Sequence, residues 1–284
     1  MRLLLLFLLL LSNIVFAQQK PKTDCNTIFV CIDSLSYKQL FANSFIKDTL
    51  FFCREETTNT TEDQYTGKYA IGKAATLEFF KPTQEDKISN HLHDFGIEFK
   101  TRKLGDLASI QNQAKKYRYT LDTSTTQLNE QDTILPWYKT LAIKPPKANF
   151  ELSILEYQAA YLNYLGFAPA AITQSMDFEA FYQQLANGRK YPRQFRKFKS
   201  VTLQIGKSKM ASVKQFCLLN GMIQKGNSFS NHEFTIYLEI INDTSISKVK
   251  AIELELIETQ KQHVIQVSDN ITISVAKKSC TISF

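Results

Sequence analysis

The order of predicted elements repeats along this chain: a strand, a helix and three strands follow one another three times. In the first unit a β-rich run over residues 27–33 leads into a helix over 35–41, with extended stretches at 50–58, 65–73 and 75–81. Repeated units of this size usually pair their sheets around a shared cleft rather than stacking as a solenoid.

The second and third units follow the same order. The second begins with a strand at 95–101 and a helix opened by Gly105, and the third with a strand at 201–205 and a helical stripe of Met210, Val213 and Cys217. Extended stretches complete them at 120–127, 135–143 and 150–157, and at 234–241, 251–257 and 271–275. The sequence therefore predicts an α+β fold of repeated βαβββ modules, two paired around a cleft plus a third C-terminal module.

The first residues have the pattern of an export signal. Arg2 precedes an apolar run from Leu3 to Leu11, and Val-Phe-Ala before Gln18 suggests cleavage near Ala17. A membrane anchor is the alternative, but a span needs about 20 apolar residues and this run breaks at Ser12. We expect an exported protein, periplasmic or secreted, without a transmembrane anchor.

The chain then divides into segments of different charge. Residues 1–17 are the signal, 18–175 the paired modules, 176–199 a helical and basic linker, and 200–284 the third module. The 34 basic and 27 acidic residues give +7, or +6 once Arg2 is removed, and six cations crowd residues 188–199. This run is either a solvated linker or a surface for a polysaccharide or another anion. Export argues against a nucleic-acid partner.

Five cysteines carry no C-x-x-C spacing, which argues against zinc knuckles and thioredoxin chemistry. Cys25 and Cys31 lie on one extended segment, about 20 Å apart at the rise of a strand, which is too far for a disulfide. Cys217 and Cys280 either form one bridge or remain buried thiols.

Several segments resemble the vicinal oxygen chelate superfamily, which includes glyoxalases, bleomycin-resistance proteins and extradiol dioxygenases. The resemblance covers roughly residues 24–160, and the whole exported chain looks like an uncharacterised glyoxalase-like family. The segments that carry it are Asn26–Asp33, Tyr65–Tyr69, Thr76–Pro82, Phe95–Phe99, Gly105–Leu107, Trp137–Tyr138 and Leu155–Tyr157.

The resemblance implies a divalent metal held by His or Glu on the first and fourth strands of each paired module. Thr27 stands in the first-strand position of module one and Glu78 in the fourth. In module two the first-strand position falls near Phe95 or Gly96, and Glu156 takes the fourth. With Glu78 and Glu156 as the remaining ligands, a hard cation such as Mg, Mn or Ca is favoured over Zn.

Strand alternation adds candidates beside these positions. It places Glu98 and Lys100 on one face, so that Glu98 would face the same cleft as Glu78 and Glu156. His93, just before this strand, is a weaker candidate ligand, because loop histidines are more often simply exposed. Tyr69 and Trp137 would either wall a ligand pocket or fill the core.

Three functions remain open at this point. The favoured one is an exported binding protein that holds a small organic ligand between modules one and two and has lost metal ligands. The second is a metal-dependent lyase, isomerase or dioxygenase that uses Glu78 and Glu156. The third is an interaction protein whose basic linker and third module dock on the cell envelope. The third module carries no acid in its expected first or last strand, and it would either pair in a homodimer or cover the cleft.

Overall fold

A computed structural model describes residues 22–85, 87–130, 133–145, 147–186 and 193–284. The expected signal segment, residues 1–17, lies outside this range, as does the part of the basic run before Arg193. No helix among the described residues has the length and apolar character needed to cross a membrane.

The first two units form one sheet of eight strands in the order β2-β3-β4-β1-β5-β8-β7-β6. In each unit the first strand runs parallel to the fourth, and β1 and β5 join the units in antiparallel fashion, with Ile28 opposite Ile97. Module one comprises β1 (Thr23–Cys31), α2 (Ser34–Leu40), η1 (Ile46–Leu50), β2 (Phe52–Asn59), β3 (Gln64–Ile71) and β4 (Thr76–Phe80). Module two comprises β5 (Phe95–Thr101), α3 (Asp106–Lys116), β6 (Asp122–Glu130), β7 (Thr133–Ile143) and β8 (Phe150–Tyr157).

Local sequence accounts for the start of each unit. Asp33 follows β1 and caps α2, since its carboxylate accepts a hydrogen bond of 2.9 Å from the backbone N–H of Ser36. In α3 the apolar side chains at Leu107, Ile110 and Ala114 fall on one face and are buried. These helices therefore pack on one face of the sheet and leave the other face free to form a cleft.

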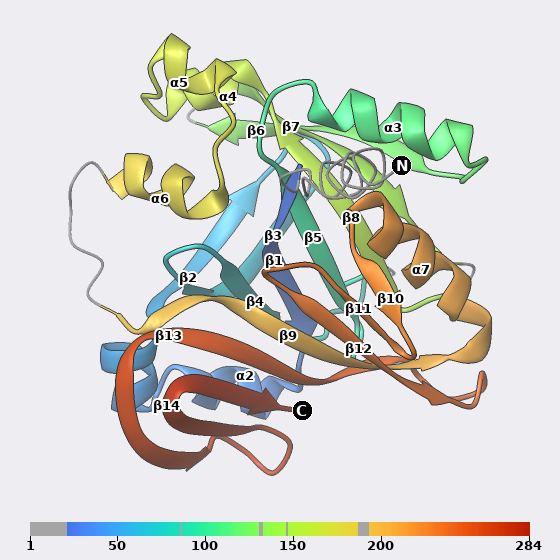
Figure 1. Cartoon of the computed structure of the whole chain (residues 1–284). Helices are drawn as coiled ribbons and strands as arrows, with labels where there is room; N and C mark the ends of the chain where they lie inside the picture. Colours follow the sequence, from blue (N-terminus) through green and yellow to red (C-terminus); the bar gives the residue numbers. More distant parts are fainter. Residues whose placement is uncertain (1–21, 86, 131–132, 146, 187–192) are drawn as a thin grey trace, which may run out of the picture.

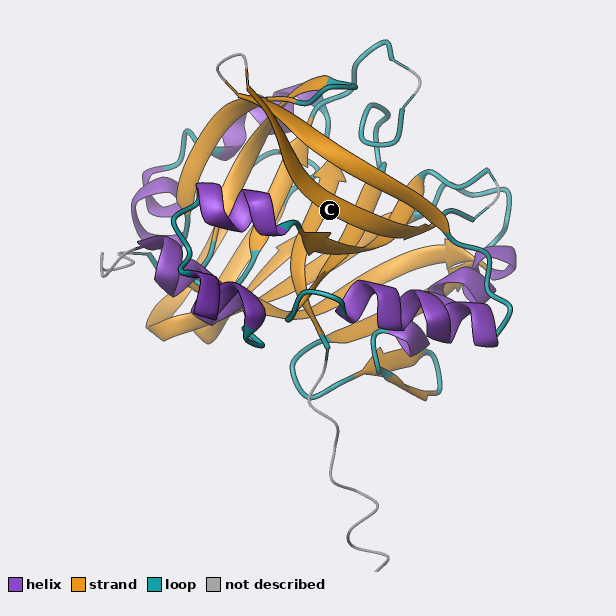
Figure 2. Cartoon of the chain, turned by 90° about the horizontal axis from the view of Figure 1, so that it is seen from above, coloured by secondary structure: helices purple, strands orange, loops and turns teal. Residues whose placement is uncertain are grey.

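The sheet curves until its two edge strands approach each other. A bridge joins Thr60, just after β2, to Leu128 of β6. In Figure 2 the strands fill the middle of the molecule and the helices lie around them. The repeated βαβββ architecture with two paired modules is thus confirmed, and the concave side of the sheet is the site expected for the cleft.

A helical insertion follows β8 and covers one end of the sheet (Figure 1). Its own apolar cluster includes Leu162, Phe167, Ile172, Phe178 and Phe181, all buried. The three helices are α4 (Ala159–Tyr164), α5 (Pro169–Thr173) and α6 (Phe178–Ala186).

The third module forms a separate six-stranded sheet in the order β10-β11-β12-β9-β13-β14. Its first strand, β9, runs parallel to β12, so β12 holds the fourth-strand position. Residues 251–257 and 271–275, expected to complete this module, instead belong to an added β13–β14 hairpin, which corrects the strand assignment. The elements are β9 (Phe195–Gly206), η2 (Lys207–Lys209), α7 (Met210–Leu219), β10 (Ile223–Lys225), β11 (Ser228–Ser230), β12 (Thr235–Ile241), β13 (Lys248–Gln266) and β14 (Thr272–Ser283).

The third module packs on the convex face of the eight-stranded sheet. The ring of Phe99, which alternation turns away from the concave side, meets Phe216 of α7 at 5.3 Å and Phe234 at 5.9 Å between centroids. The module therefore lies on the side opposite the cleft, which corrects the alternative that it covers the cleft.

Cations assigned to the basic linker are partly built into the third sheet. β9 begins at Phe195, inside the range 176–199. Arg196 pairs with Glu179 and Glu255 at 3.1 and 2.6 Å, and Lys199 pairs with Glu253 at 2.6 Å. These side chains are internally neutralised, which weakens the expectation of a basic docking surface. All five cysteines are free thiols, so Cys217 and Cys280 form no bridge.

Candidate functional site: a cleft between the first two modules

A cavity of about 820 Å³ opens on the concave side of the eight-stranded sheet. Side chains from β1, β3, β4, β5, β6, β7 and β8 line it, together with the loop after β4. This volume lies within the range typical of small-molecule sites. The predicted cleft between modules one and two is therefore present.

The floor of the cleft is formed where β1 meets β5. Phe29 lies opposite Gly96, and its ring covers that glycine so closely that an added Cβ would lie 2.0 Å from the ring. Gly96 is thus required by close packing, and Phe29 fills the space that a side chain at position 96 would occupy.

We predict that Gly96→Ala lowers the free energy of unfolding by about 1–3 kcal/mol, because the new methyl group displaces the Phe29 ring. Urea unfolding of the two proteins measures this difference. The double variant Gly96→Ala/Phe29→Ala should lose less than the sum of the two single changes. Strict additivity would show that the two residues do not compete for space.

Two acids face the cleft on either side of β1. Glu78 of β4 stands opposite Phe29, and Glu98 of β5 stands opposite Thr27; both acids line the cavity. Burial, and then the neighbouring Glu151, raise the pKa of Glu98 to about 7. Burial, and then Glu98, raise the pKa of Glu78 well above its ordinary range. The predicted pair Glu78 and Glu98 is brought together.

A third acid of the cleft, Glu151, was not predicted. It lies on β8 opposite Gly96, and its carboxylate pairs with Lys144 at 3.4 Å. The next residue on this face, Ser153, is buried and stands opposite Glu98; its hydroxyl interacts with the Glu98 carboxyl and partly offsets the rise in the pKa of that acid. Alternation counted from Phe150 would have indicated both.

Aromatic rings wall the cleft on the module-one side. Phe80 contacts Tyr65 at 6.0 Å and Phe29 at 5.9 Å, both edge to face, and Tyr138 of β7 lines the opposite side. The predicted Tyr69 lies opposite Glu78, and burial and that acid raise its pKa. Tyr65, four residues earlier on the same face, is the ring that borders the cavity.

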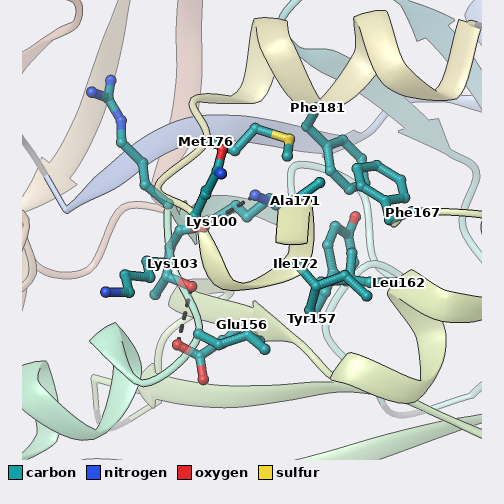
Figure 3. A pocket seen from close by; sticks show the side chains of 14 residues that line it. Lys100, Lys103, Glu156, Tyr157, Leu162, Phe167, Ala171, Ile172, Met176 and Phe181 are labelled. Carbon is teal, nitrogen blue, oxygen red and sulfur yellow. Dashed lines mark hydrogen bonds between the residues drawn. The ribbon is translucent and has the colours of Figure 1, made fainter. Parts of the chain in front are cut away.

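The placement of Glu156 in the cleft is corrected. The carboxylate of Glu156, labelled in Figure 3, accepts hydrogen bonds from the Leu107 backbone N–H at 3.0 Å and from the Thr101 hydroxyl at 3.3 Å. Leu107 lies in the first turn of α3, so Glu156 occupies the face of β8 that packs against this helix. Because β8 alternates, the cleft receives Glu151 and Ser153 instead.

We predict that Glu156→Ala lowers the free energy of unfolding by about 1–2 kcal/mol, since the α3 N-terminus loses an acceptor. Thermal unfolding measures the loss, and Glu156→Gln, which keeps an amide oxygen, should lose less. A carboxylate of the cleft would behave differently: its removal would change ligand binding and leave α3 intact.

Lys100 and Trp137 also lie away from the cavity. Lys100 keeps the face expected from alternation, but the insertion helices cover it: its ammonium lies 4.8 Å from the Phe181 ring and donates to the Thr101 carbonyl at 3.0 Å (Figure 3). Burial lowers the pKa of Lys100 to about 8. Trp137 packs against Tyr161 of α4, at 6.0 Å.

His93 lies outside the cleft as well, and the donors present do not fit the implied metal. His93 borders a different cavity, beside Lys248 near the third module. Over the described ranges, no three His, Cys, Asp or Glu side chains are grouped so as to bind a metal ion. With Glu156 turned toward α3, Glu78 loses the partner ligand that the resemblance implied.

Comparison with known proteins places the chain in a family and in a known fold. A family model described as "Family of unknown function (DUF5829)" matches residues 25–284. No curated protein has significant similarity to the chain.

Among solved structures, a hypothetical protein from Staphylococcus aureus is 11% identical with a TM-score of 0.51, over 86% of this chain and 95% of that one. A mutant 4-hydroxymandelate synthase from Streptomyces coelicolor is 13% identical (TM-score 0.46; 81% and 70% coverage). A 2,2',3-trihydroxybiphenyl 1,2-dioxygenase from Sphingomonas wittichii is 10% identical (TM-score 0.43; 90% and 91%). Similarity at this level concerns the fold.

Proposed function

Since the chain belongs to the family of unknown function DUF5829, whose model covers both cleft modules, we propose that it is an exported protein that binds a small organic ligand between modules one and two. The observation that carries this proposal is the cavity of about 820 Å³, in which buried carboxyl groups converge with aromatic rings. Most of the residues that line it are polar, and small-molecule sites likewise use polar groups in a concave surface to orient the ligand.

The corrected position of Glu156 counts against the metal-dependent enzyme. That alternative needed Glu78 and Glu156 as ligands of one ion, and ligand oxygens lie about 2.0–2.6 Å from such an ion. Glu156 instead binds the N-terminus of α3, on the other face of the sheet. The envelope-docking alternative is weakened in turn by the ion pairs of Arg196 and Lys199.

A fragment screen tests the proposal. A library of neutral, anionic and cationic organic molecules is titrated into the ¹⁵N-labelled mature protein, and amide shifts are followed by NMR. We expect hits that shift the Gly96 and Glu98 amides. Ala142→Phe, which places a ring at the cavity wall, should abolish them. Ala276→Phe, on the exposed side of β14, is the matched control and should not. Fragments that bind the Ala142→Phe variant as they bind the wild type, or an absence of hits at the cleft, would contradict the proposal.

Export is tested separately. In a native host, the intact mass of the protein should correspond to a chain that begins at Gln18. A protein that retains its first residues in the cell interior would remove this part of the proposal and leave ligand binding intact.

A further inference from the structure

We infer that the ligand of the cleft carries an organic cation, and that its ammonium group lies between the side chains of Glu78 and Glu98. This inference rests on the proposed function and specifies the chemical class of the ligand.

Charge accounting is the first step. The lysines at the cleft have other partners: Lys144 pairs with Glu151 at 3.4 Å, and Lys87 pairs with Asp63 and Glu85 at 2.8 and 3.1 Å. Lys81 lies over the Tyr37 ring at 5.8 Å. Across the described part of the chain, Glu78 and Glu98 form no ion pair within 4 Å.

The second step is the cost of this arrangement. Two acids that share a cavity without a counterion disfavour each other's ionised form, and burial disfavours it further, so the acids retain protons more tightly. An anionic ligand would add a third negative group. A cationic ligand would supply the missing counterion for both acids. Of the three charge types, we therefore expect a cation to bind most tightly in this cleft.

Aromatic faces supply the third step. Phe80 contacts both Phe29 and Tyr65 on the module-one side of the cavity, and Tyr138 lines the other side. Aromatic rings attract ammonium groups through their π faces, by about 0.5–2 kcal/mol each.

An organic cation fits these groups better than a metal ion. Divalent Mg, Mn and Ca need several oxygen ligands in a closed shell. Glu78 and Glu98 are the two cleft acids without an ion pair among the described residues. They lie on β4 and β5, which β1 separates, and the aromatic rings of Phe29 and Phe80 lie beside them. A bulky ammonium group, which needs contact surface rather than a fixed coordination number, matches that spacing.

Choline and its neutral isostere 3,3-dimethylbutan-1-ol are the probes, because they differ in charge and match in shape. Each is titrated into the ¹⁵N-labelled mature protein at pH 8. We expect choline to bind at least tenfold more tightly than the isostere and to shift the Gly96 and Glu98 amides. Glu78→Gln and Glu98→Gln should each weaken choline at least fivefold. Glu258→Gln, at an exposed acid of the third module, is the matched control and should have no effect.

The other outcomes are distinct. If the isostere binds the cleft as well as choline does, the cation inference fails and the ligand-binding proposal stands. If Mn²⁺ at equimolar concentration broadens the Glu98 and Gly96 signals and choline does not compete, the site is a metal site and the inference fails. If neither choline nor any library fragment binds at the cleft, both the inference and the proposed function fail. Unchanged NMR spectra away from the cleft confirm that the variants fold.

Discussion

Asp24→Ala is expected to lower the free energy of unfolding by about 3 kcal/mol, because it removes the buried counterion of the Arg102 guanidinium and leaves only the more exposed Glu233, at 3.1 Å. Arg102 binds the Asp24 carboxylate through Nε at 2.9 and 3.1 Å and through a second nitrogen, and both side chains are about 10% exposed. The other oxygen of Asp24 accepts the Phe178 N–H at 3.0 Å at the start of α6. One carboxylate therefore ties β1, the end of β5 and the insertion together.

Two controls separate a buried charge from a lost contact. The double variant Asp24→Leu/Arg102→Met should be more stable than Asp24→Ala, because it removes both charges. Glu56→Ala breaks the exposed pair with Arg54, whose atoms are 3.8 Å apart, and should cost less than about 1 kcal/mol. Urea unfolding gives all the values. A loss for Asp24→Ala no larger than that for Glu56→Ala would contradict this account.

Period-2 alternation and the repeated element order were sufficient to predict the cleft. They place Glu78 and Glu98 on the concave side, where the structure has them. They also predict the face of Lys100, although not the helices that cover it, because the contact with Phe181 joins residues far apart in the sequence. A strand pattern states which face a residue occupies; it does not state what covers that face.

Glu156 shows where counting along a strand fails. The metal position was assigned near the end of β8, yet pairing with β5 sets the register, with Gly96 opposite Glu151 and Glu98 opposite Ser153. A shift of one residue moves a side chain to the other face. Position 156 therefore reaches α3, whereas the acid of the cleft stands five residues earlier.

The third module was misassigned for a related reason. β10 and β11 are 3 residues each, too short to show an alternation, whereas β13 spans 19 residues and dominates the local pattern. The strong strand pattern of β13 and β14 therefore predicts that they belong to the repeated unit. In the structure that unit ends at β12, before these two strands.

Glu98→Gln is expected to stabilise the protein at pH 7.5, by about 2–3 kcal/mol. The pKa of Glu98 is raised from its ordinary 4.5 to about 7, so the folded protein holds this proton more tightly than the unfolded chain. The stabilisation that comes from this tighter proton binding is complete below about pH 4.5 and is lost as the pH rises through about 7. The wild type should therefore lose about 2 kcal/mol between pH 5 and pH 7.5 through this group.

Other titratable groups near Glu98 also contribute to the pH dependence of the free energy of unfolding. Glu78, Glu151, Tyr65 and Tyr138 all lie toward the same cavity, and the pKa of Glu78 is raised in the same sense. Lys100, with a pKa lowered to about 8, changes stability only above that pH, and in the opposite sense. Urea unfolding at pH 5 and pH 7.5 thus reports on the acids, and the difference between the wild type and Glu98→Gln isolates this one.

Glu258→Gln provides the matched control, because the same exchange at an exposed acid should leave the pH profile of the wild type unchanged. Parallel profiles for Glu98→Gln and the wild type would show that Glu98 ionises normally in the folded state. If Glu98→Gln is more stable and also binds choline more weakly, the carboxylate that destabilises the empty cleft is the group that stabilises its ligand. Such a pairing is expected where an acid without a counterion is maintained for the ligand rather than for the fold.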